Sequence, residues 1–287
     1  MLIMIKFHLN HTMLTSTILS IGRSTPMAEL SRTSKEQFDK QAAHYDSEWN
    51  TWSEHTLTWL VKAAAPKPSD FVLDVATGTG FTARALAGLV SSVVAADVST
   101  GMLEQAASLS AVAGIENIQF VEAPAEELPF DDSVFDIVTC RIAAHHFVSI
   151  EDFAAESYRV LQPGGRLVIV DTSVPDNDFL AAIWQNEVER LRDPSHGKNY
   201  TVREWRKILG RPGFEIVTAD DTAGGIRIPL TSWITKAGCT EEQEKEVRAK
   251  FADASQNIRS RYSIETDEAG ETWFTWLRVS ILAVKPA

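Results

Sequence analysis

Apolar residues come in short runs along most of the chain, and segments with the periodicity of amphipathic helices separate these runs. The clearest run, Phe71 to Val75, follows two prolines that end a helical pattern. Strands that are apolar throughout are typical of a parallel sheet covered by helices on both faces. The pattern predicts seven strands, at 71–75, 92–96, 118–121, 135–140, 166–170, 214–217 and 272–284. Helices are predicted at 82–89, 102–113, 152–161 and 241–258.

This alternation predicts an α/β fold: a doubly wound, Rossmann-like, mostly parallel seven-stranded sheet over residues 67–287. Residues 28–66 have helical spacing and are expected to form an N-terminal cap. Residues 176–210, after the fifth strand, are helical and aromatic and are expected to form a helical insert. Residues 1–27 are expected to be a flexible or targeting-like extension, because the first 26 contain two basic residues and no acid.

The composition is that of a globular protein with an acidic balance. The chain has 27 Lys and Arg against 39 Asp and Glu, a formal charge of −12. That balance disfavours nucleic acid as a partner. The sequence also has no run of about 18 apolar residues, so we expect no stable membrane insertion. The two cysteines have neither disulfide-framework nor metal-site spacing, so we expect no metal and a reducing, cytoplasmic location. If residues 1–26 are an organelle presequence, the location is mitochondrial.

A glycine-containing loop follows the first predicted strand. Gly78 and Gly80 allow a sharp turn and a close approach of the backbone to a ligand. Asp97 ends the next predicted strand, where a carboxylate can accept hydrogen bonds from both hydroxyls of a ribose. The alternative is an ordinary strand-to-helix turn, but the pair of features predicts a nucleoside site.

Asp74, at the end of the strand before the loop, bears on which nucleoside binds. A carboxylate there would repel the pyrophosphate of a dinucleotide, whereas it suits a cationic sulfonium or an amino group. S-adenosylmethionine has both groups. A nicotinamide-dependent oxidoreductase remains an alternative, because Gly78, Gly80 and Ala83 fit a dinucleotide fingerprint loosely.

At these residues the chain resembles the class I S-adenosylmethionine-dependent methyltransferases. Their first motif is matched by Asp74, Gly78 and Gly80, with Ala76 where glycine is commoner, and their ribose acid by Asp97. Further matches at 126–130, 135–138 and 159–165 resemble the branch with ubiquinone and menaquinone biosynthesis enzymes and many small-molecule methyltransferases. The resemblance implies the cofactor-binding residues Asp74, Ala76, Gly78, Gly80, Asp97, Val98, Met102, Ala125, Glu126 and Arg141.

The residues expected near adenine carry alternatives. Met102 falls where the family packs an apolar side chain against adenine, but it also fits the core of a helix. Pro124 stands where many relatives have an acid that accepts the adenine amino group. We therefore expect adenine to be held by the backbone around Ala125, or by Glu126.

The methyl acceptor should lie beyond the fourth and fifth strands, near residues 140–147. A histidine there can accept a proton during methyl transfer, so His146, and less so His145, is the candidate base. Adjacent side chains on extended backbone point opposite ways, so one of the two is expected to face the acceptor; the alternative is a loop anchor. Trp184, His196 and Tyr200 of the insert, with His146, are expected to bind the acceptor, although a helix-ending turn explains part of that segment.

The function that follows is methyl transfer from S-adenosylmethionine to a small-molecule acceptor. One alternative belongs to another class: a protein that binds S-adenosylmethionine and serves as a regulator or assembly factor without catalysis. The sequence leaves open which acceptor is used, which atom is methylated and the oligomeric state.

Overall fold

The computed structural model describes residues 34–39, 49–221 and 225–287. The predicted extension, residues 1–27, lies outside the described residues, as does part of the predicted cap. The described parts of the cap are helical at residues 34–39 and in α2 (Trp49–Ala64). Among the described residues, no helix combines the length and the apolar character that crossing a bilayer requires.

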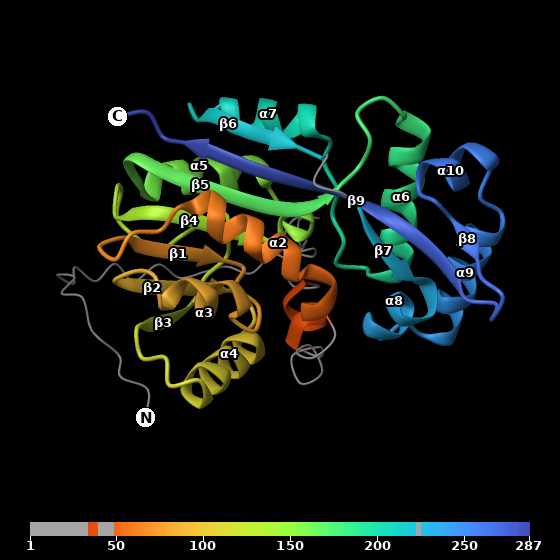
Figure 1. The fold of residues 1–287 in the computed structure, drawn as a ribbon, viewed down its shortest axis with the longest axis horizontal. Helices are drawn as coiled ribbons and strands as arrows, with labels where there is room; N and C mark the ends of the chain where they lie inside the picture. Colours follow the sequence, from red (N-terminus) through yellow and green to blue (C-terminus); the bar gives the residue numbers. More distant parts are fainter. Residues whose placement is uncertain (1–33, 40–48, 222–224) are drawn as a thin grey trace, which may run out of the picture.

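One twisted sheet organises the molecule (Figure 1). Its main path runs β3-β2-β1-β4-β5-β9-β6. The first five strands in sequence are parallel: β1 (Phe71–Val75), β2 (Ser92–Asp97), β3 (Ile118–Glu122), β4 (Phe135–Arg141) and β5 (Leu161–Ser173). The long strand β9 (Thr272–Val284) lies antiparallel between β5 and β6 (Glu215–Asp220). The predicted Rossmann-like α/β fold is confirmed.

Helices cover both faces because alternate residues of each strand point to opposite sides. Val72 packs with α2 and α3 (Phe81–Ala87), and its neighbour Leu73 packs with α5 (Ile150–Val160) and α7 (Val202–Gly210). α4 (Thr100–Val112) packs along β2 and β3. The carboxyl ends of the parallel strands therefore meet at one edge of the sheet, where ligands bind in such folds.

A smaller lobe surrounds the first half of β9, shown beside the main sheet in Figure 1. It comprises α6 (Phe179–Arg192), β7 (Ile226–Pro229), α8 (Leu230–Lys236), α9 (Glu241–Ala252), α10 (Gln256–Arg261) and β8 (Glu265–Thr266). Its core is aromatic, with Trp233, Phe251, Tyr262, Phe274 and Trp276 buried together. The 13 residues of β9 are enough to pair with β5 and β6 in the main sheet and with β7 and β8 in the small lobe.

The structure corrects three details of the predicted elements. β7 and β8 were not predicted; they pair only with β9, and their two to four residues are too short for a periodic signal. The helix predicted at 241–258 is two helices, because the Ser255 side chain caps α10 by accepting from the backbone N–H of Ile258. Residues 176–210 do not form one insert: α6 packs in the small lobe, whereas α7 packs on β6 and α5.

Candidate functional site

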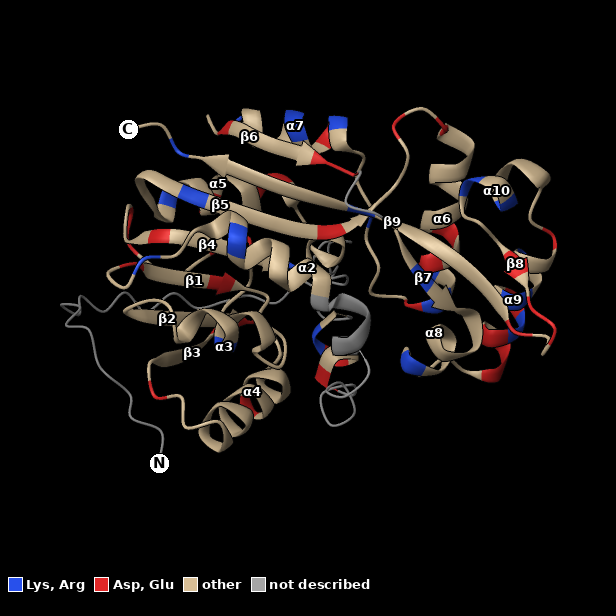
Figure 2. Ribbon diagram, viewed as in Figure 1, with Lys and Arg blue, Asp and Glu red and all other residues tan. Residues whose placement is uncertain are grey.

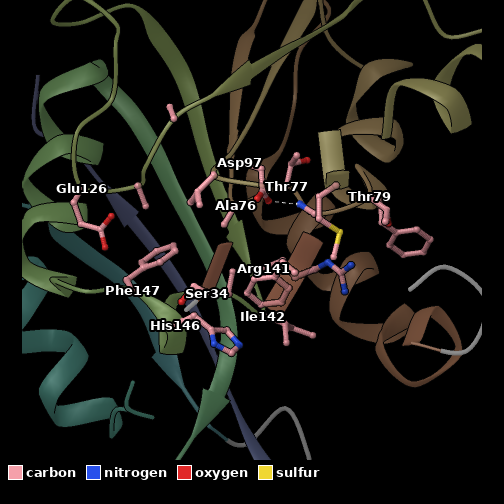
Figure 3. Close-up of a pocket in the computed structure, with 18 of the residues that line it drawn as sticks. Ser34, Ala76, Thr77, Thr79, Asp97, Glu126, Arg141, Ile142, His146 and Phe147 are labelled. Carbon is pink, nitrogen blue, oxygen red and sulfur yellow. Dashed lines mark hydrogen bonds between the residues drawn. The ribbon is translucent and has the colours of Figure 1, made fainter. Parts of the chain in front are cut away.

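A cavity of about 1200 Å³, including its open mouth, lies at the carboxyl ends of β1 to β4. Figure 3 shows side chains from several loops around this hollow, among them Asp97, Glu126, Arg141 and His146. The predicted site residues that line it are Ala76, Gly78, Asp97, Val98, Met102, Ala125, Glu126, Arg141 and His146. Residues far apart in the sequence thus share one site, as the ends of neighbouring parallel strands require.

The loop after β1 needs left-handed backbone at three positions. Ala76 has φ 52°, Gly78 φ 56° and Gly80 φ 79°. Gly78 lines the cavity, and a Cβ added there meets no atom within 4 Å. A Cβ on Gly80 would lie 3.0 Å from the Cβ of Ala106, so this glycine permits close packing of α4. Gly78 therefore leaves space in the cavity, whereas Gly80 does not line the cavity and allows α4 to pack closely.

Asp97 ties the end of β2 to the glycine loop. Its Oδ2 accepts from the backbone N–H of Gly78 at 2.8 Å, and its Oδ1 accepts from that of Ser99 at 2.9 Å (dashed line to Gly78 in Figure 3). Burial raises the pKa of Asp97 to about 6, against these hydrogen bonds, which lower it. The remaining lone pairs of the carboxylate are available to ribose hydroxyls.

Asp74 lies behind the loop and does not line the cavity. It is 1% exposed and accepts hydrogen bonds at 2.6 Å from the hydroxyls of Thr77 and Thr139. Burial raises its pKa, whereas the two threonine hydrogen bonds and the charge of Arg141 lower it. Its hydrogen-bond partner Thr77 does line the cavity.

The far end of the nucleoside region is apolar with one carboxylate. Met102 and Ala125 are buried and line the cavity. Glu126 lines it too, but its Oε1 is engaged by the backbone N–H of Val148 at 2.8 Å. Its other oxygen has no hydrogen bond among the described residues, so the structure is compatible with both adenine-binding alternatives.

These residues fit S-adenosylmethionine. The open space above Gly78 leaves room for a ligand against the backbone, Asp97 offers a carboxylate to ribose, and Met102 and Ala125 offer apolar walls to a base. Arg141 is held beside this region by a 3.0 Å hydrogen bond from Nε to the Thr82 hydroxyl.

His146 lines the cavity away from the nucleoside region. The sequence predicted extended backbone here, but His146 lies in a short 3₁₀ helix, η2 (Ala144–His146). Its Nδ1 lies 3.0 Å from the Ser195 hydroxyl and 3.1 Å from the Ser195 carbonyl oxygen. The Ser195 hydroxyl donates to Asp193 at 2.6 Å. A carbonyl can only accept, so Nδ1 carries the proton and Nε2 carries the lone pair of the neutral ring.

His145 is turned away from the cavity toward Asp171. Its Nδ1 lies 2.6 Å from the carboxylate, and its backbone N–H donates to the same side chain at 3.0 Å. Burial lowers the pKa of His145, but the charge and hydrogen bond of Asp171 outweigh burial and raise it. Burial and the charge of His145 together lower the pKa of His146 to about 4.

Comparison with known proteins identifies the chain. Residues 73–169 match the family model described as a methyltransferase domain. The chain is 32% identical over 239 residues to YcgJ, an uncharacterised methyltransferase of Bacillus subtilis, covering 83% of this chain and 93% of that relative. It belongs to the class I S-adenosylmethionine-dependent methyltransferases.

Two further similarities agree. The crystal structure of YcgJ matches with a TM-score of 0.76 at 31% identity, covering 82% of this chain and 99% of that one. The ubiquinone/menaquinone biosynthesis C-methyltransferase UbiE of Ectopseudomonas mendocina is 34% identical over 56% of this chain and 66% of that relative. The predicted branch, the cofactor and methyl transfer to a small-molecule acceptor are confirmed at the level of the family, and the oxidoreductase alternative falls away.

Three residues predicted to bind the acceptor do not line the cavity of this methyltransferase. Trp184 stacks on Tyr262 at 5.6 Å between ring centroids, inside the small lobe. His196 is 2% exposed, and its Nε2 lies 3.0 Å from Oδ1 of Asn186. Tyr200 follows the insert's turn, bridges Ser173 at the end of β5 and packs on the ring of Trp205. Their polar and aromatic character reflects packing, which the sequence does not distinguish from ligand contact.

The sequence reasoning missed several lining residues of the methyltransferase. Phe38 comes from residues 34–39, Ile226 from the unpredicted strand β7, and Arg278 from the middle of β9. Arg278 had a usable signal, because it is the one charged residue in the 13 residues of β9. Among the described residues no group of three or more His, Cys, Asp and Glu side chains is arranged for a metal ion.

Proposed function

We propose that this methyltransferase acts on a small, largely apolar acceptor with an ionisable hydroxyl, and that His146 is the base that accepts the hydroxyl proton. The observation that carries the proposal is the fixed tautomer of His146. Its Nδ1 proton is held by Ser195, so its basic Nε2 is the nitrogen left for a ligand in the cavity that also holds Asp97 and Gly78.

S-adenosylmethionine supplies the activated methyl group on its sulfonium. His146 is neutral above about pH 5, because burial and His145 lower its pKa to about 4, so its lone pair is available at neutral pH. Asp193 lies behind Ser195 and stabilises the positive charge that the ring acquires when Nε2 takes a proton. The acceptor oxygen that loses this proton becomes the stronger nucleophile.

The walls near His146 support an apolar acceptor. Phe38, Ile142, Phe147 and Ile226 line this part, and Phe38 makes an edge contact with the His146 ring at 5.0 Å. The relatives named UbiE are C-methyltransferases of ubiquinone and menaquinone biosynthesis, which supports a hydroxylated ring and leaves open methylation on oxygen or on an activated carbon.

Under this proposal, the segment 176–210 contributes to the site through the turn that follows α6. Asp193 and Ser195 follow α6 and hold His146, whereas Trp184 belongs to the small-lobe core. Basic and acidic residues are interspersed over both lobes in Figure 2, which supports a small molecule over nucleic acid as the partner. Two free cysteines support a cytoplasmic location.

The test is release of S-adenosylhomocysteine with a panel of phenols, quinols and amines. We expect turnover with phenols or quinols and its loss in His146→Gln. His55→Gln is the matched control, because His55 is exposed on α2. Binding of S-adenosylmethionine without turnover of any acceptor in the panel or in cell extract would instead support the regulatory or assembly alternative.

A further inference from the structure

Arg278 is a buried cation at the acceptor end of the cavity. It lies opposite Thr172, one residue before the end of β5, and is 5% exposed. It lines the same cavity as Gly78 and His146. In the sheet order, β9 is three strands away from β1, roughly 14 Å at about 4.8 Å per strand. Arg278 is therefore too far along the edge to belong to the glycine loop.

The hydrogen bonds of Arg278 leave one side of its guanidinium open. Nη1 donates to the hydroxyl of Thr172. Nε is buried and has no acceptor, and no described residue accepts from Nη2. Nε–H and Nη2–H point the same way in a guanidinium, so together they form a fork that matches two oxygens of one planar group.

The neighbouring carboxylates do not fill this fork. Asp171 is engaged by His145 at 2.6 Å, and Glu189 accepts from Gln185 at 3.3 Å and from Asn199 at 3.0 Å. No carboxylate of the described residues lies within 4 Å of the Arg278 nitrogens. An unpaired buried guanidinium is costly, and an anionic ligand that reaches it recovers that cost.

We propose that Arg278 binds a carboxylate of the methyl acceptor through Nε and Nη2. The inference rests on the proposed function and narrows its substrate class to hydroxylated organic acids, with the hydroxyl at His146 and the carboxylate at Arg278. Ile226 supports the apolar body between them: it pairs with Trp276, two residues from Arg278 on β9, and lines the cavity.

The test measures binding alone, in protein saturated with S-adenosylhomocysteine. Titration calorimetry compares benzoate, its neutral analogue benzamide, and phenyl phosphate at millimolar concentrations. We expect benzoate to bind at least about tenfold more tightly than benzamide, as for a charge-assisted pair of hydrogen bonds. Arg278→Gln should abolish the difference, and Arg278→Lys should lose about fivefold because lysine keeps the charge but not the fork.

Arg227→Gln is the control, since Arg227 is an exposed arginine of β7 and should leave benzoate binding unchanged. Equal binding of benzoate and benzamide by the wild type, or unchanged benzoate binding in Arg278→Gln, overturns the inference. So does an Arg278-dependent preference for phenyl phosphate, which would assign the fork to a phosphate. If Arg278→Gln does not fold, the wild-type comparison and Arg278→Lys decide.

The two levels of the proposal fail differently. Failure to bind S-adenosylhomocysteine, or turnover that does not depend on His146, counts against the proposed function. Cofactor binding and His146-dependent turnover with indifference to the carboxylate count against the role of Arg278 alone.

Discussion

The imidazole of His146 points Nδ1 at Ser195, 3.0 Å from the hydroxyl oxygen, and that hydroxyl donates in turn to Asp193. His146 and Ser195 are 49 residues apart in sequence, whereas Ser195 and Asp193 are two residues apart. Because the Ser195 hydroxyl donates its proton to Asp193, both Ser195 oxygens near Nδ1 of His146 can only accept from it. The arrangement fixes both the tautomer and the orientation of the histidine ring.

Replacing the base and its support should lower turnover to different extents. His146→Gln removes the proton acceptor and should lower kcat by about 10²- to 10⁴-fold. Ser195→Ala removes one orienting hydrogen bond and should lower kcat by about fivefold, near 1 kcal/mol. Steady-state kinetics with saturating S-adenosylmethionine measure both.

The KM for S-adenosylmethionine should stay the same in both variants, since Asp97 bonds to Gly78 and Ser99 and has no hydrogen bond with His146 or Ser195. A rise in that KM without a fall in kcat would indicate a structural role for Ser195. Unchanged kcat in His146→Gln would remove the histidine from the chemistry.

Neutralising His145 should raise the pKa of His146. The pKa of His146 lies at about 4 because of burial and the nearby charge of His145. His145→Gln removes the second cause and takes from Asp171 its imidazole partner while two backbone hydrogen bonds remain, and both changes favour the protonated ring of His146. The NMR titration of His146 should therefore move from about pH 4 toward the ordinary histidine value, and the acid limb of kcat should move the same way. A midpoint that stays at about 4 would show that burial acts alone.

Cofactor affinity should depend on the ionisation of Asp97. With a pKa of about 6 in the free protein, the carboxylate is protonated as the pH falls below 6 and can accept fewer hydrogen bonds from ribose. The Kd of S-adenosylhomocysteine should therefore rise between about pH 7 and about pH 5, by up to tenfold per pH unit below the pKa. Calorimetry measures it.

Asp97→Asn provides the matched control for that titration. Its affinity should be about 10- to 100-fold weaker at neutral pH and should vary little with pH, because the amide does not titrate. The same pH dependence in both proteins would assign the effect to another group.

The two loop glycines should respond differently to an added methyl group. Gly78→Ala should fold with a loss of about 1 kcal/mol from its positive φ, but should lose cofactor binding because its Cβ projects into the cavity. Gly80→Ala should lose a further 1–3 kcal/mol or so, because its Cβ would lie 3.0 Å from that of Ala106. Urea unfolding measures the loss of stability, and calorimetry measures the loss of cofactor binding. Adding Ala106→Gly should restore part of the stability of Gly80→Ala but not that of Gly78→Ala.

Ala76 should be improved by glycine. Its φ of 52° is strained for alanine, so Ala76→Gly should raise the free energy of unfolding by up to about 1 kcal/mol, after the entropy that glycine adds to the unfolded chain. Ala113→Gly, at the exposed C-cap of α4 with φ −81°, is the control and should lower it by about 0.4–1 kcal/mol, because glycine adds entropy to the unfolded chain and relieves no strain. A loss of stability at both positions would show that Ala76 is not strained.

Much of the fold follows from local pattern. The strand Phe71–Val75 is apolar except for Asp74, is bounded by prolines and a glycine loop, and is long enough to be recognised without its neighbours. β7 has four residues with one charge and one proline, so its strand conformation depends on pairing with β9. The small lobe was therefore missed as a unit, although its helices were partly predicted.

The cofactor half of the site is predictable for the same reason: Gly78, Asp97 and Met102 lie in short motifs whose conformation is set locally, at the ends of predicted strands. The acceptor half is not. Trp184 was predicted to contact the acceptor but packs in a core, whereas Arg278 was not singled out but lines the cavity.

By itself, the sequence determined the α/β architecture, the nucleoside loop and the choice of methyltransferase chemistry, since strand periodicity, glycine torsions and the position of a carboxylate are properties of neighbouring residues. Only the tertiary structure decided that Asp74 lies behind the loop, that Ser195 and Asp193 hold His146, and that Arg278 faces the same cavity. The contact of His146 with Ser195 joins residues 49 apart in sequence, and that of Arg278 with Thr172 joins residues 106 apart. The second contact exists only because β5 and β9 pair.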